Sequence, residues 1–430
     1  MSSALPSYQQ AADIVAASAA RLAPSRAAQV VEQVALGESA GRVLARALMA
    51  DRDQPPFARS TRDGFACRAA EASTHRPLAL VGAARAGDAP SGPLPPASVW
   101  EIMTGAPVPT GADAVMMIEH VETSGGAESR GAVAGKVRLL PPRSVEPGEN
   151  IVAQGAQARE GDQLLEAGTV LQFGQIALAA SCGYAALHVF RRPRVAILTT
   201  GDELAAVDAI PRPGQIRNSN APMLAALVAA AGGEPWILPT AADNAPALDA
   251  LLAPAATADL LLVSGGVSAG KFDLVEPALA RLGARFHFTG VRIQPGKPTV
   301  FGELPRGAGS PSPTLPFFGL PGNPISSAVT FLLFAAPVLA ALAGRRQSAP
   351  RFALARLAPP VDRHGKPGLT RFLPALCDFG SPAGQPPQVA LVPWHGSGDL
   401  EAMARSNCFL VVPEEAHSLE PGDLVRILLS

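Results

Sequence analysis

Residues 264–273 read SGGVSAGKFD, directly after the apolar run ADLLLV, and they match two unrelated catalytic patterns. The stretch from Gly265 to Lys271 spells G-x-x-x-x-G-K, which is close to the P-loop that binds nucleotide phosphates. A P-loop needs Ser or Thr after its Lys, because that hydroxyl binds magnesium. Here Phe272 follows instead and offers no ligand atom. The sequence therefore argues against a P-loop.

The second pattern is G-x-S-x-G, the nucleophile elbow of many hydrolases, with Ser268 as the nucleophile. An elbow needs its Ser on a sharp turn directly after a strand, but the expected strand ends near Ser264. We interpret the segment instead as a glycine-rich loop whose N–H groups suit an oxyanion or a phosphate. Asp273 could cap the helix that follows, which would still leave an oxygen for a ligand or a cation.

Three further loops carry groups that suit an anionic ligand and a hard cation. TGDEL (200–204) places the carboxylates of Asp202 and Glu203 after a predicted strand, where they could also serve as a helix cap. QPGKP (294–298) fixes Lys297 between two prolines, although a plain surface turn would have the same residues. LPGNP (320–324) leads into an apolar helix, so we expect its N–H groups to face outward as another anion site.

A parallel sheet would bring these loops together. From Pro193 to about residue 345, strand and helix signals alternate. RVAILTT, PWILPT, DLLLVS and LPFFGL read as strands, and APMLAALVAAAGG and NAPALDALLAPA read as helices. This alternation predicts a mainly parallel sheet with helices on both faces. Ligands of such sheets bind beyond the carboxyl ends of the strands, where the polar loops are expected.

The flanking regions read differently. Residues 7–50 are expected to be mostly helical, including GRVLARALMA, and residues 51–190 to be β-rich or mixed with many turns. Residues 346–430 contain short β segments, which predict a small all-β domain. The uncharged stretch 325–344 is long enough to cross a bilayer. Because it contains Ser326, Ser327, Thr330 and Pro337, we expect a buried core helix instead.

Composition excludes several classes of protein. The 430 residues allow about three domains, and the net charge of −1 argues against nucleic-acid binding. The four cysteines are scattered without a C-x-x-C pair, and the seven histidines lack metal-binding spacing. The N-terminus has no signal-peptide pattern. We expect a reduced, cytoplasmic protein that does not bind a membrane.

Taken together, the motifs TGDEL, GQIRNSN, SGGVSAGKFD, QPGKP and LPGNP resemble those of the molybdopterin molybdenumtransferases, the MoeA family, which includes the E domain of gephyrin. The likeness extends over nearly the whole chain. DQPPFARSTRDGFA and IMTGAPVPTGADAVMMIE are similar to signatures of the family's N-terminal region, and HGSGDLEAMARSNCFLVVP is similar to its C-terminal barrel.

The resemblance implies a multidomain α/β plus β fold. Its centre would be a doubly wound, mainly parallel-sheet domain of the MoaB/MogA type that binds molybdopterin. The expected domains are an N-terminal linker and dimerisation domain (1–50 and 145–190), an inserted β-rich domain (51–144), the α/β domain (191–345) and a C-terminal β-barrel (346–430).

The resemblance also implies a reaction. Molybdenum from molybdate would be inserted into adenylyl-molybdopterin with release of AMP and with help from Mg²⁺. A homodimer is implied, with the active cleft shared between two subunits. Possible protein partners are the molybdopterin adenylyltransferase and the molybdoenzymes that receive the cofactor.

Site residues carry over position by position. The implied catalytic residues are Asp63, Thr104, Glu203, Asp243 and Asp273. The implied ligands of the cation are Asp202, Glu203, Asp243 and Asp273. The residues implied to bind phosphate and pterin are Thr200, Gly201, Asn220, Ser264, Gly265, Gly266, Ser268, Gly270, Lys297, Pro321, Gly322, Asn323 and Pro324.

Three positions depart from the family pattern. Val152 and Gln157 stand where an arginine and an aspartate are often found, and Gly290 replaces a common lysine, for which Arg292 could compensate. Two other functions therefore stay open at this point. One is the preceding adenylylation step, and the other is a molybdopterin-binding scaffold without catalysis.

Overall fold

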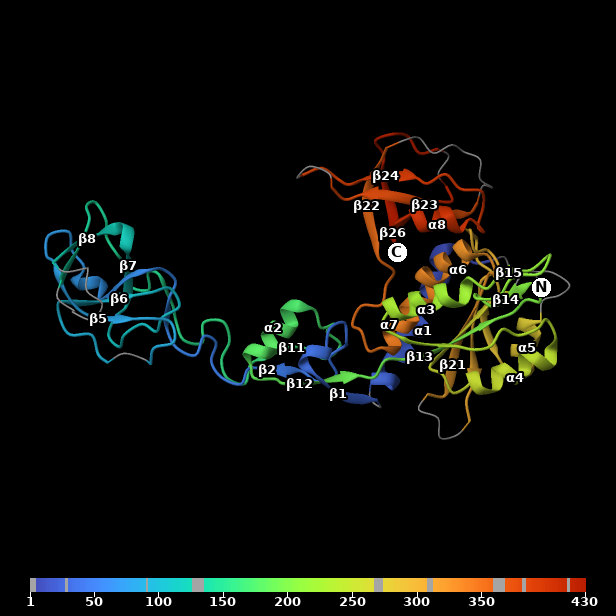
Figure 1. Ribbon diagram of the computed structural model, residues 1–430, viewed down its shortest axis with the longest axis horizontal. Coiled ribbons are helices and arrows are strands. Elements are labelled where there is room, and N and C mark those ends of the chain that lie inside the picture. Colours follow the sequence, from blue (N-terminus) through green and yellow to red (C-terminus); the bar gives the residue numbers. More distant parts are fainter. Residues whose placement is uncertain are drawn as a thin grey trace. The chain divides into compact units, whose positions relative to one another are not determined.

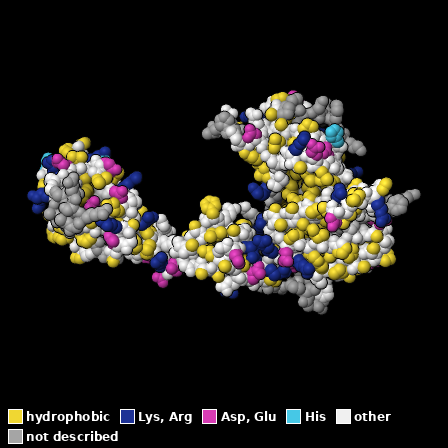
Figure 2. Space-filling model, in the orientation of Figure 1, with side chains coloured by type: hydrophobic (Ala, Val, Ile, Leu, Met, Phe, Trp, Pro, Cys, Tyr) yellow, Lys and Arg dark blue, Asp and Glu magenta, His cyan; other side chains and the backbone are white. Residues whose placement is uncertain are grey.

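The computed structural model describes residues 5–27, 30–89, 92–125, 135–266, 274–307, 312–358, 368–380, 384–415 and 418–430. The chain divides into two compact units. The first comprises residues 1–46, 167–173 and 186–430, and the second comprises residues 47–166 and 174–185. Figure 1 labels the elements of both units. Basic and acidic side chains lie next to one another on the face shown in Figure 2, in keeping with the near-neutral net charge.

The centre of the first unit is a six-stranded sheet of order β16-β13-β17-β21-β20-β18. Strands β16, β13, β17 and β21 run parallel to one another, whereas β20 is antiparallel to both β21 and β18. Their bounds are β13 (Arg194–Thr199), β16 (Glu234–Ile237), β17 (Leu260–Ser264), β18 (Arg285–Phe288), β20 (Val300–Pro305) and β21 (Thr314–Leu320). A short parallel pair, β14 (Leu204–Ala205) and β15 (Ile216–Arg217), lies in the segment after β13. The predicted mainly parallel sheet is confirmed.

Helices cover both faces of this sheet (Figure 1). Alternate residues of β13 point to opposite faces, so Val195 and Ile197 pack in one core, and Ala196 and Leu198 pack in the other. The first core includes α1 (Tyr8–Ala27), α3 (Asn220–Ala230), α6 (Pro324–Thr330) and α7 (Ala336–Leu342). The second core includes α4 (Ala245–Ala255) and α5 (Val275–Arg281). The domain is therefore doubly wound.

The uncharged stretch that begins near residue 325 forms the central helix of the first core. One turn of π-helix, Phe331–Ala335, joins α6 to α7, and Pro337 follows directly within α7. The helix Pro324–Leu342 is apolar enough to cross a membrane, but 89% of its most apolar window is buried inside the protein. The prediction of a buried core helix is confirmed.

The C-terminal strands form a closed five-stranded barrel. The order β23-β24-β22-β26-β25 closes because β25 also pairs with β23. The short β19 (Ile293–Gln294) adds to the outside of β23. The bounds are β22 (Phe352–Leu357), β23 (Thr370–Asp378), β24 (Gln388–Leu391), α8 (Leu400–Arg405), β25 (Cys408–Val412) and β26 (Leu424–Leu429). Phe372 and Phe409 of the barrel belong to the same core as α1 and α7. The predicted barrel is confirmed.

The N-terminal segment is helical only in α1, which shows that the expected helix over GRVLARALMA was wrong. After α1 come β1 (Val31–Ala35) and a 3₁₀ turn (Leu36–Glu38). β1 pairs with β12 (Ala186–Phe190), while Val43 and Leu44 form bridges to Val170 and Val189. Gly41 has φ +73°, a conformation that ends regular structure at this point. Long-range pairing thus overrides the local helical pattern.

The second unit is built on another six-stranded sheet, of order β7-β4-β6-β5-β9-β8. Its buried face contains Phe65, Val99, Met116 and Val137. The bounds are β4 (Gly64–Cys67), β5 (Leu78–Ala84), β6 (Ser98–Ile102), β7 (Ala114–Met117), β8 (Val121–Ser124) and β9 (Gly135–Leu139), with 3₁₀ turns at Ala69–Glu71 and Ile118–His120. The unit also contains β2 (Leu48–Met49), β3 (Arg59–Ser60), β10 (Ile151–Val152), β11 (Gln163–Leu165) and most of α2 (Phe173–Ser181). The β-rich texture predicted here is confirmed. The residue bounds of the four expected domains stay a prediction.

Candidate active site

Four loops of the α/β domain meet at the carboxyl edge of its sheet. Backbone hydrogen bonds join them beyond the strand ends. The N–H of Thr200 donates to Ser264 O (3.1 Å), that of Gly201 to Ala241 O (3.3 Å), and that of Gly265 to Leu320 O (3.1 Å). The loops after β13, β16, β17 and β21 are therefore held side by side.

Asp202 and Asp243 are tied to each other across two of these loops. The N–H of Asp202 donates to Asp243 Oδ2 (3.4 Å), and the N–H of Asp243 donates to Asp202 Oδ1 (3.1 Å). Within the described chain, this leaves the second oxygen of each carboxylate open to solvent or a ligand. Neither residue caps a helix, because Asn244 is the N-cap of α4 and accepts the N–H of Ala247. The cap alternative for the TGDEL carboxylates does not apply.

Glu203 follows Asp202 directly in the chain. Its carboxylate lies against Gly201, where a Cβ would come 2.5 Å from Oε2. Gly201 has φ +147°, which side-chain-bearing residues rarely adopt. Glycine is thus required for Glu203 to fold back in this way.

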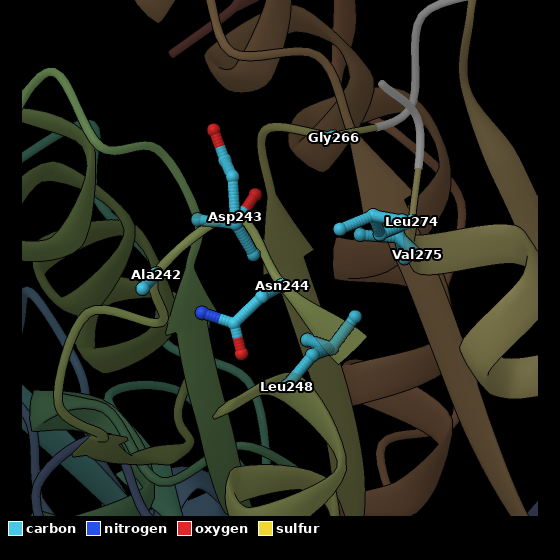
Figure 3. A pocket seen from close by; sticks show the side chains of 8 residues that line it. Ala242, Asp243, Asn244, Leu248, Gly266, Leu274 and Val275 are labelled. Carbon is cyan, nitrogen blue, oxygen red and sulfur yellow. The ribbon is translucent and has the colours of Figure 1, made fainter. Parts of the chain in front are cut away.

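A small pocket lies between the loop after β16 and the start of α5. Figure 3 shows Asp243 and Asn244 on one side of it and Leu274 and Val275 on the other, with Gly266 also lining it. Gly265 and Gly266 both have positive φ, and a Cβ on Gly265 would lie 2.6 Å from Thr200 O. The glycines therefore let this loop approach Thr200 and the start of α5 closely, and Gly266 lines the pocket.

Two buried amide side chains hold this edge from beneath, and one was not predicted. Asn218 donates to the hydroxyl oxygens of Thr199 (2.9 Å), the last residue of β13, and of Thr240 (3.1 Å), which follows β16. Its Oδ1 accepts the N–H of Ala221 in the first turn of α3. The motif GQIRNSN contained Asn218, but no periodicity or spacing marked its partners.

Asn220 makes the second buried contact. Its Nδ2 donates to Ser264 Oγ (2.9 Å) and to Gly322 O (2.6 Å), so it joins the loop after β17 to the LPGNP turn. Ser264 Oγ lies 3.3 Å from Ser327 Oγ, and Ser327 donates in turn to Pro321 O. The structure thus brings together Asn220, Ser264, Pro321 and Gly322, and adds Ser327.

The LPGNP turn is only partly open. A barrel loop covers the start of α6, where the N–H of Ile325 donates to Ser397 O (3.0 Å). Asn323 Nδ2 also donates to Ser397 Oγ (2.8 Å). The N–H of Ile325, the residue directly after this turn, is therefore not open to a ligand. Ser397 belongs to HGSGD, which the sequence marked only as part of the barrel.

Lys297 lies at the same edge of the sheet because β20 runs antiparallel to β21. Val300 at the start of β20 pairs with Gly319 near the end of β21. The turn before β20 therefore lies where the loops after the parallel strands lie. The side chain of Lys297 is exposed, and its carbonyl accepts the N–H of Val291.

Gly290, where the sequence departs from the family pattern, and Arg292 both lie near this turn, and the structure shows what each contacts. A Cβ on Gly290 would lie 2.9 Å from Leu5 Cδ2, so a larger residue would displace Leu5. Arg292, expected to compensate for a missing lysine, lies 3.5 Å from Glu414 of the barrel.

Asp63 and Thr104 form a compact pair in the second unit. Asp63 Oδ1 accepts both the N–H of Thr104 (2.6 Å) and its hydroxyl (2.8 Å). The backbone hydrogen bond and then the hydroxyl bond lower the pKa of Asp63 below its ordinary value, against a smaller effect of burial. The carboxylate is thus kept ionised on an exposed surface. In the same unit, Val152 pairs with Arg59 in the ladder of β10 and β3.

Three predicted site residues, Ser268, Gly270 and Asp273, lie outside the described residues, as does Lys271. Within the described residues, no three His, Cys, Asp or Glu side chains gather as a metal site. The carboxylates of the first unit therefore offer two adjacent ligands rather than a complete cage.

Comparisons with known proteins found matches over nearly the whole chain. Three family models match, described as the MoeA N-terminal region (domain I and II) over residues 6–183, a probable molybdopterin binding domain over 196–341, and the MoeA C-terminal region (domain IV) over 356–430. A molybdopterin molybdenumtransferase of Nostoc sp. is 33% identical, covering 99% of this chain and 94% of the relative. The chain belongs to the molybdopterin molybdenumtransferase family.

Other members of this family agree. The molybdopterin molybdenumtransferase of Bacillus subtilis is 35% identical over 93% of this chain and 89% of its own length. Crystal structures of a molybdopterin biosynthesis MoeA protein from Pyrococcus horikoshii cover 99% of this chain. One has a TM-score of 0.71 at 29% identity and covers 99% of that protein, and the other has 0.75 at 26% and covers 100%. The family resemblance found in the sequence is confirmed.

Proposed function

We propose that this chain inserts molybdenum from molybdate into adenylyl-molybdopterin and releases AMP. The observation that carries the proposal is the Asp202–Asp243 pair beside glycine-rich loops at the carboxyl edge of the sheet, in a member of the molybdenumtransferase family. Two carboxylates suit a cation that neutralises a phosphoanhydride, and backbone N–H groups suit its oxygens.

The glycine-rich loop after β17, which begins with Gly265 and Gly266, would bind the anionic part of the substrate. Gly265 and Gly266 approach Thr200 so closely that a Cβ would not fit, and we propose that the loop they begin binds the anion through backbone N–H groups. Lys297 supplies an exposed positive charge at the same edge. Ser268 and Gly270 remain proposed contributors from the same loop. The proline-bounded turn reduces the freedom that Lys297 loses on binding phosphate.

Mg²⁺ is proposed as the assisting cation. Asp202 and Asp243 fit it, because Mg²⁺ commonly binds through one or two carboxylates and completes its shell with substrate phosphate oxygens and water. Glu203 and Asp273 are proposed as further acidic groups of this region. When bound, Mg²⁺ would offset the negative charge of the phosphoanhydride.

Asp63 and Thr104 are proposed to complete the site from the partner subunit of a homodimer. The ionised carboxylate of Asp63 and the neighbouring Thr104 could then orient the incoming molybdate or an attacking water. The protein is further proposed to act in the cytoplasm, to accept substrate from the molybdopterin adenylyltransferase and to deliver cofactor to molybdoenzymes.

Adenylylation of molybdopterin is the nearest alternative reaction. The relatives that match almost the full length of the chain are named molybdenumtransferases, which favours insertion. A scaffold without catalysis would share the fold and bind the same pterin. The departures Val152 and Gln157 motivate testing this second alternative.

The deciding experiment uses purified full-length protein with adenylyl-molybdopterin, molybdate and MgCl₂. We expect AMP release that requires both molybdate and protein, together with cofactor that reconstitutes an apo-molybdoenzyme. Omitting Mg²⁺ or replacing Asp63 with Ala should abolish most of the product. Tight pterin binding without AMP release would favour the scaffold. ATP-dependent formation of adenylyl-molybdopterin from molybdopterin would favour the adenylyltransferase.

A further inference from the structure

A chain of hydrogen bonds runs beneath the LPGNP turn, and its direction is fixed by the two carbonyl groups that it reaches. Carbonyl oxygens can only accept, so Asn220 must direct Nδ2 to Gly322 O, and Ser327 must donate its hydroxyl to Pro321 O. Ser327 Oγ is then the acceptor for the Ser264 hydroxyl, 3.3 Å away. Asn220 Nδ2 donates its other hydrogen to Ser264 Oγ. Each side chain therefore donates to the next, from Asn220 through Ser264 and Ser327 to the carbonyl of Pro321.

All three members of this chain are shielded from solvent. Ser327 is 0% exposed, Ser264 is 2% exposed and Asn220 is 9% exposed. They come from three separate elements, α6, β17 and α3. Within the described residues, Asn220 Oδ1 is the one oxygen of the set without a partner. A buried polar group without a partner costs about 1–3 kcal/mol, so breaking a bond of this set is unfavourable. The chain therefore fixes the distance between the three elements.

The carbonyl orientations determine where the N–H groups of the turn point. In a trans peptide the C=O and the following N–H point in opposite directions. With Pro321 O and Gly322 O turned inward, the N–H groups of Gly322 and Asn323 face away from the buried chain. Both residues are exposed, and within the described residues neither N–H donates a hydrogen bond. Gly322 also packs beside Gly265, where a Cβ on Gly322 would lie 3.7 Å from Gly265 Cα.

We propose that Ser327 is a positioning residue for the reaction. With Asn220 and Ser264, it orients the Pro321–Gly322 peptide groups so that the exposed side of the turn meets the substrate beside Gly265. Ser327 does not touch the substrate. The inference rests on the proposed function for its kinetic part, but the orientation of the turn is independent of it.

The test compares Ser327→Ala with Thr330→Val in the full-length protein. Thr330 lies about one turn further along α6, is also fully buried, and donates only within the helix, to Ser326 O and Ser327 O. Valine keeps the methyl group that contacts Gly296. We expect Ser327→Ala to lower kcat/KM for adenylyl-molybdopterin about tenfold or more, while Thr330→Val stays within twofold. Comparable thermal stability of the two variants would show that the loss is not one of folding.

Ser264→Ala provides a second, coupled measurement. If the two hydroxyls act in one chain, the double variant Ser264→Ala/Ser327→Ala should lose no more activity than the worse single variant. Losses that multiply would overturn the inference. So would equal activity of the Ser327→Ala and Thr330→Val variants.

Crystal structures separate this inference from the proposed function. In Ser327→Ala, we expect the Pro321–Gly322 peptide plane to rotate relative to wild type, with or without turnover. An unchanged plane would overturn the positioning role. If the wild-type protein releases no AMP, the proposed function fails, and the peptide plane still decides the structural claim.

Discussion

Asp202 and Asp243 each accept a hydrogen bond from the other's backbone N–H, so two acidic side chains of neighbouring loops are held as a pair. Like charges at close range repel, which makes such a pair unfavourable for stability alone. A cation between the two carboxylates would reverse that effect. This reasoning supports the proposal that the pair binds a cation.

Replacing Asp243 with Asn should distinguish the proposed binding of a cation from the effect of charge repulsion on stability. The amide keeps the size of the side chain and one oxygen for the Asp202 N–H, but removes a charge. We expect kcat/KM for insertion to fall about 100-fold, which corresponds to about 2.7 kcal/mol of transition-state stabilisation. The melting temperature without Mg²⁺ should stay equal or rise, because repulsion is relieved.

Asp249 supplies the matched control for that variant. It lies on α4 and pairs with Arg281 on the exposed surface, 2.9 Å apart. Asp249→Asn should leave insertion unchanged and alter stability by less than about 1 kcal/mol. Equal activity losses in the two variants would count against a cation role for Asp243.

The Asp63–Thr104 pair predicts a measurable change in acid titration. Hydrogen bonds from Thr104 hold the pKa of Asp63 below its ordinary value. Their contribution to stability is thus present above the unfolded pKa, about 3.9, and is lost as pH falls through the folded value. Thr104→Val removes the hydroxyl bond and should move the pKa of Asp63 upward, toward its ordinary value. Carbon-13 NMR of labelled aspartate in the full-length protein can follow this change.

Thr110→Val is the control for the same measurement. Thr110 is exposed in the same unit and accepts the N–H of Leu94 through its backbone carbonyl, which valine retains. The Asp63 titration should be the same in this variant and in wild type. An unaltered Asp63 pKa in Thr104→Val would show that the hydroxyl bond is absent in solution.

Glu303 predicts a large stability effect far from the ligand edge. This residue of β20 is 6% exposed and accepts hydrogen bonds from Ser18, Arg21, His287 and Thr314. Burial would raise its pKa, but the bonds from His287, Thr314 and Ser18 and the charge of Arg21 lower it overall. The stabilisation is therefore present above the ordinary glutamate pKa, about 4.3, and is lost as pH falls through the lower folded value.

Glu303→Gln should lower the free energy of unfolding in urea at pH 7 by about 1–3 kcal/mol, because the donors Ser18, His287 and Thr314 lose a buried, charged acceptor. The deficit should shrink below pH 4. Glu401→Gln serves as the control, since Glu401 pairs with Arg405 on an exposed helix surface. That change should cost less than about 1 kcal/mol. Equal costs for the two variants would argue that the Glu303 contacts contribute little.

The core beneath α7 gives a fourth prediction. Phe334 is fully buried, and its ring lies 6.3 Å from that of Tyr8 and 5.9 Å from that of Phe288. Phe334→Ala should lower the free energy of unfolding by about 3–5 kcal/mol through lost burial and a cavity. Phe173 is 89% exposed in the same unit, so Phe173→Ala should change it by less than about 0.5 kcal/mol. Similar values would mean that the π-helical turn Phe331–Ala335 is not packed as described.

The α/β domain could be predicted because each buried strand is a short apolar run followed by a glycine or a polar turn. β17, for example, is Leu260–Ser264 and is buried throughout. The segment around Gly41 to Ala50 could not, because its extended form depends on pairing with residues more than a hundred positions away. The spacing of apolar residues within a segment does not show which distant segment it will pair with.

The candidate site also contains residues that the sequence predicted and residues that it did not. Asp202, Gly265 and Lys297 stood out because carboxylate, glycine and lysine followed or preceded predicted strands. Asn218 and Ser327 did not, because their function depends on which carbonyl or hydroxyl the fold places beside them. Ser327 was visible only as a polar residue in an apolar helix. Its partner Pro321 became evident from the geometry of the turn.

The shared core of the barrel and the α/β domain restricts how this protein can be divided. The ring of Phe372 in the barrel lies 5.5 Å from that of Tyr8, and Ser397 of a barrel loop accepts the N–H of Ile325. A chain cut after residue 345 would remove the barrel ring that covers Tyr8 and the carbonyl that accepts the Ile325 N–H. The barrel is therefore not a module that can be detached without exposing part of the core that it shares with the α/β domain.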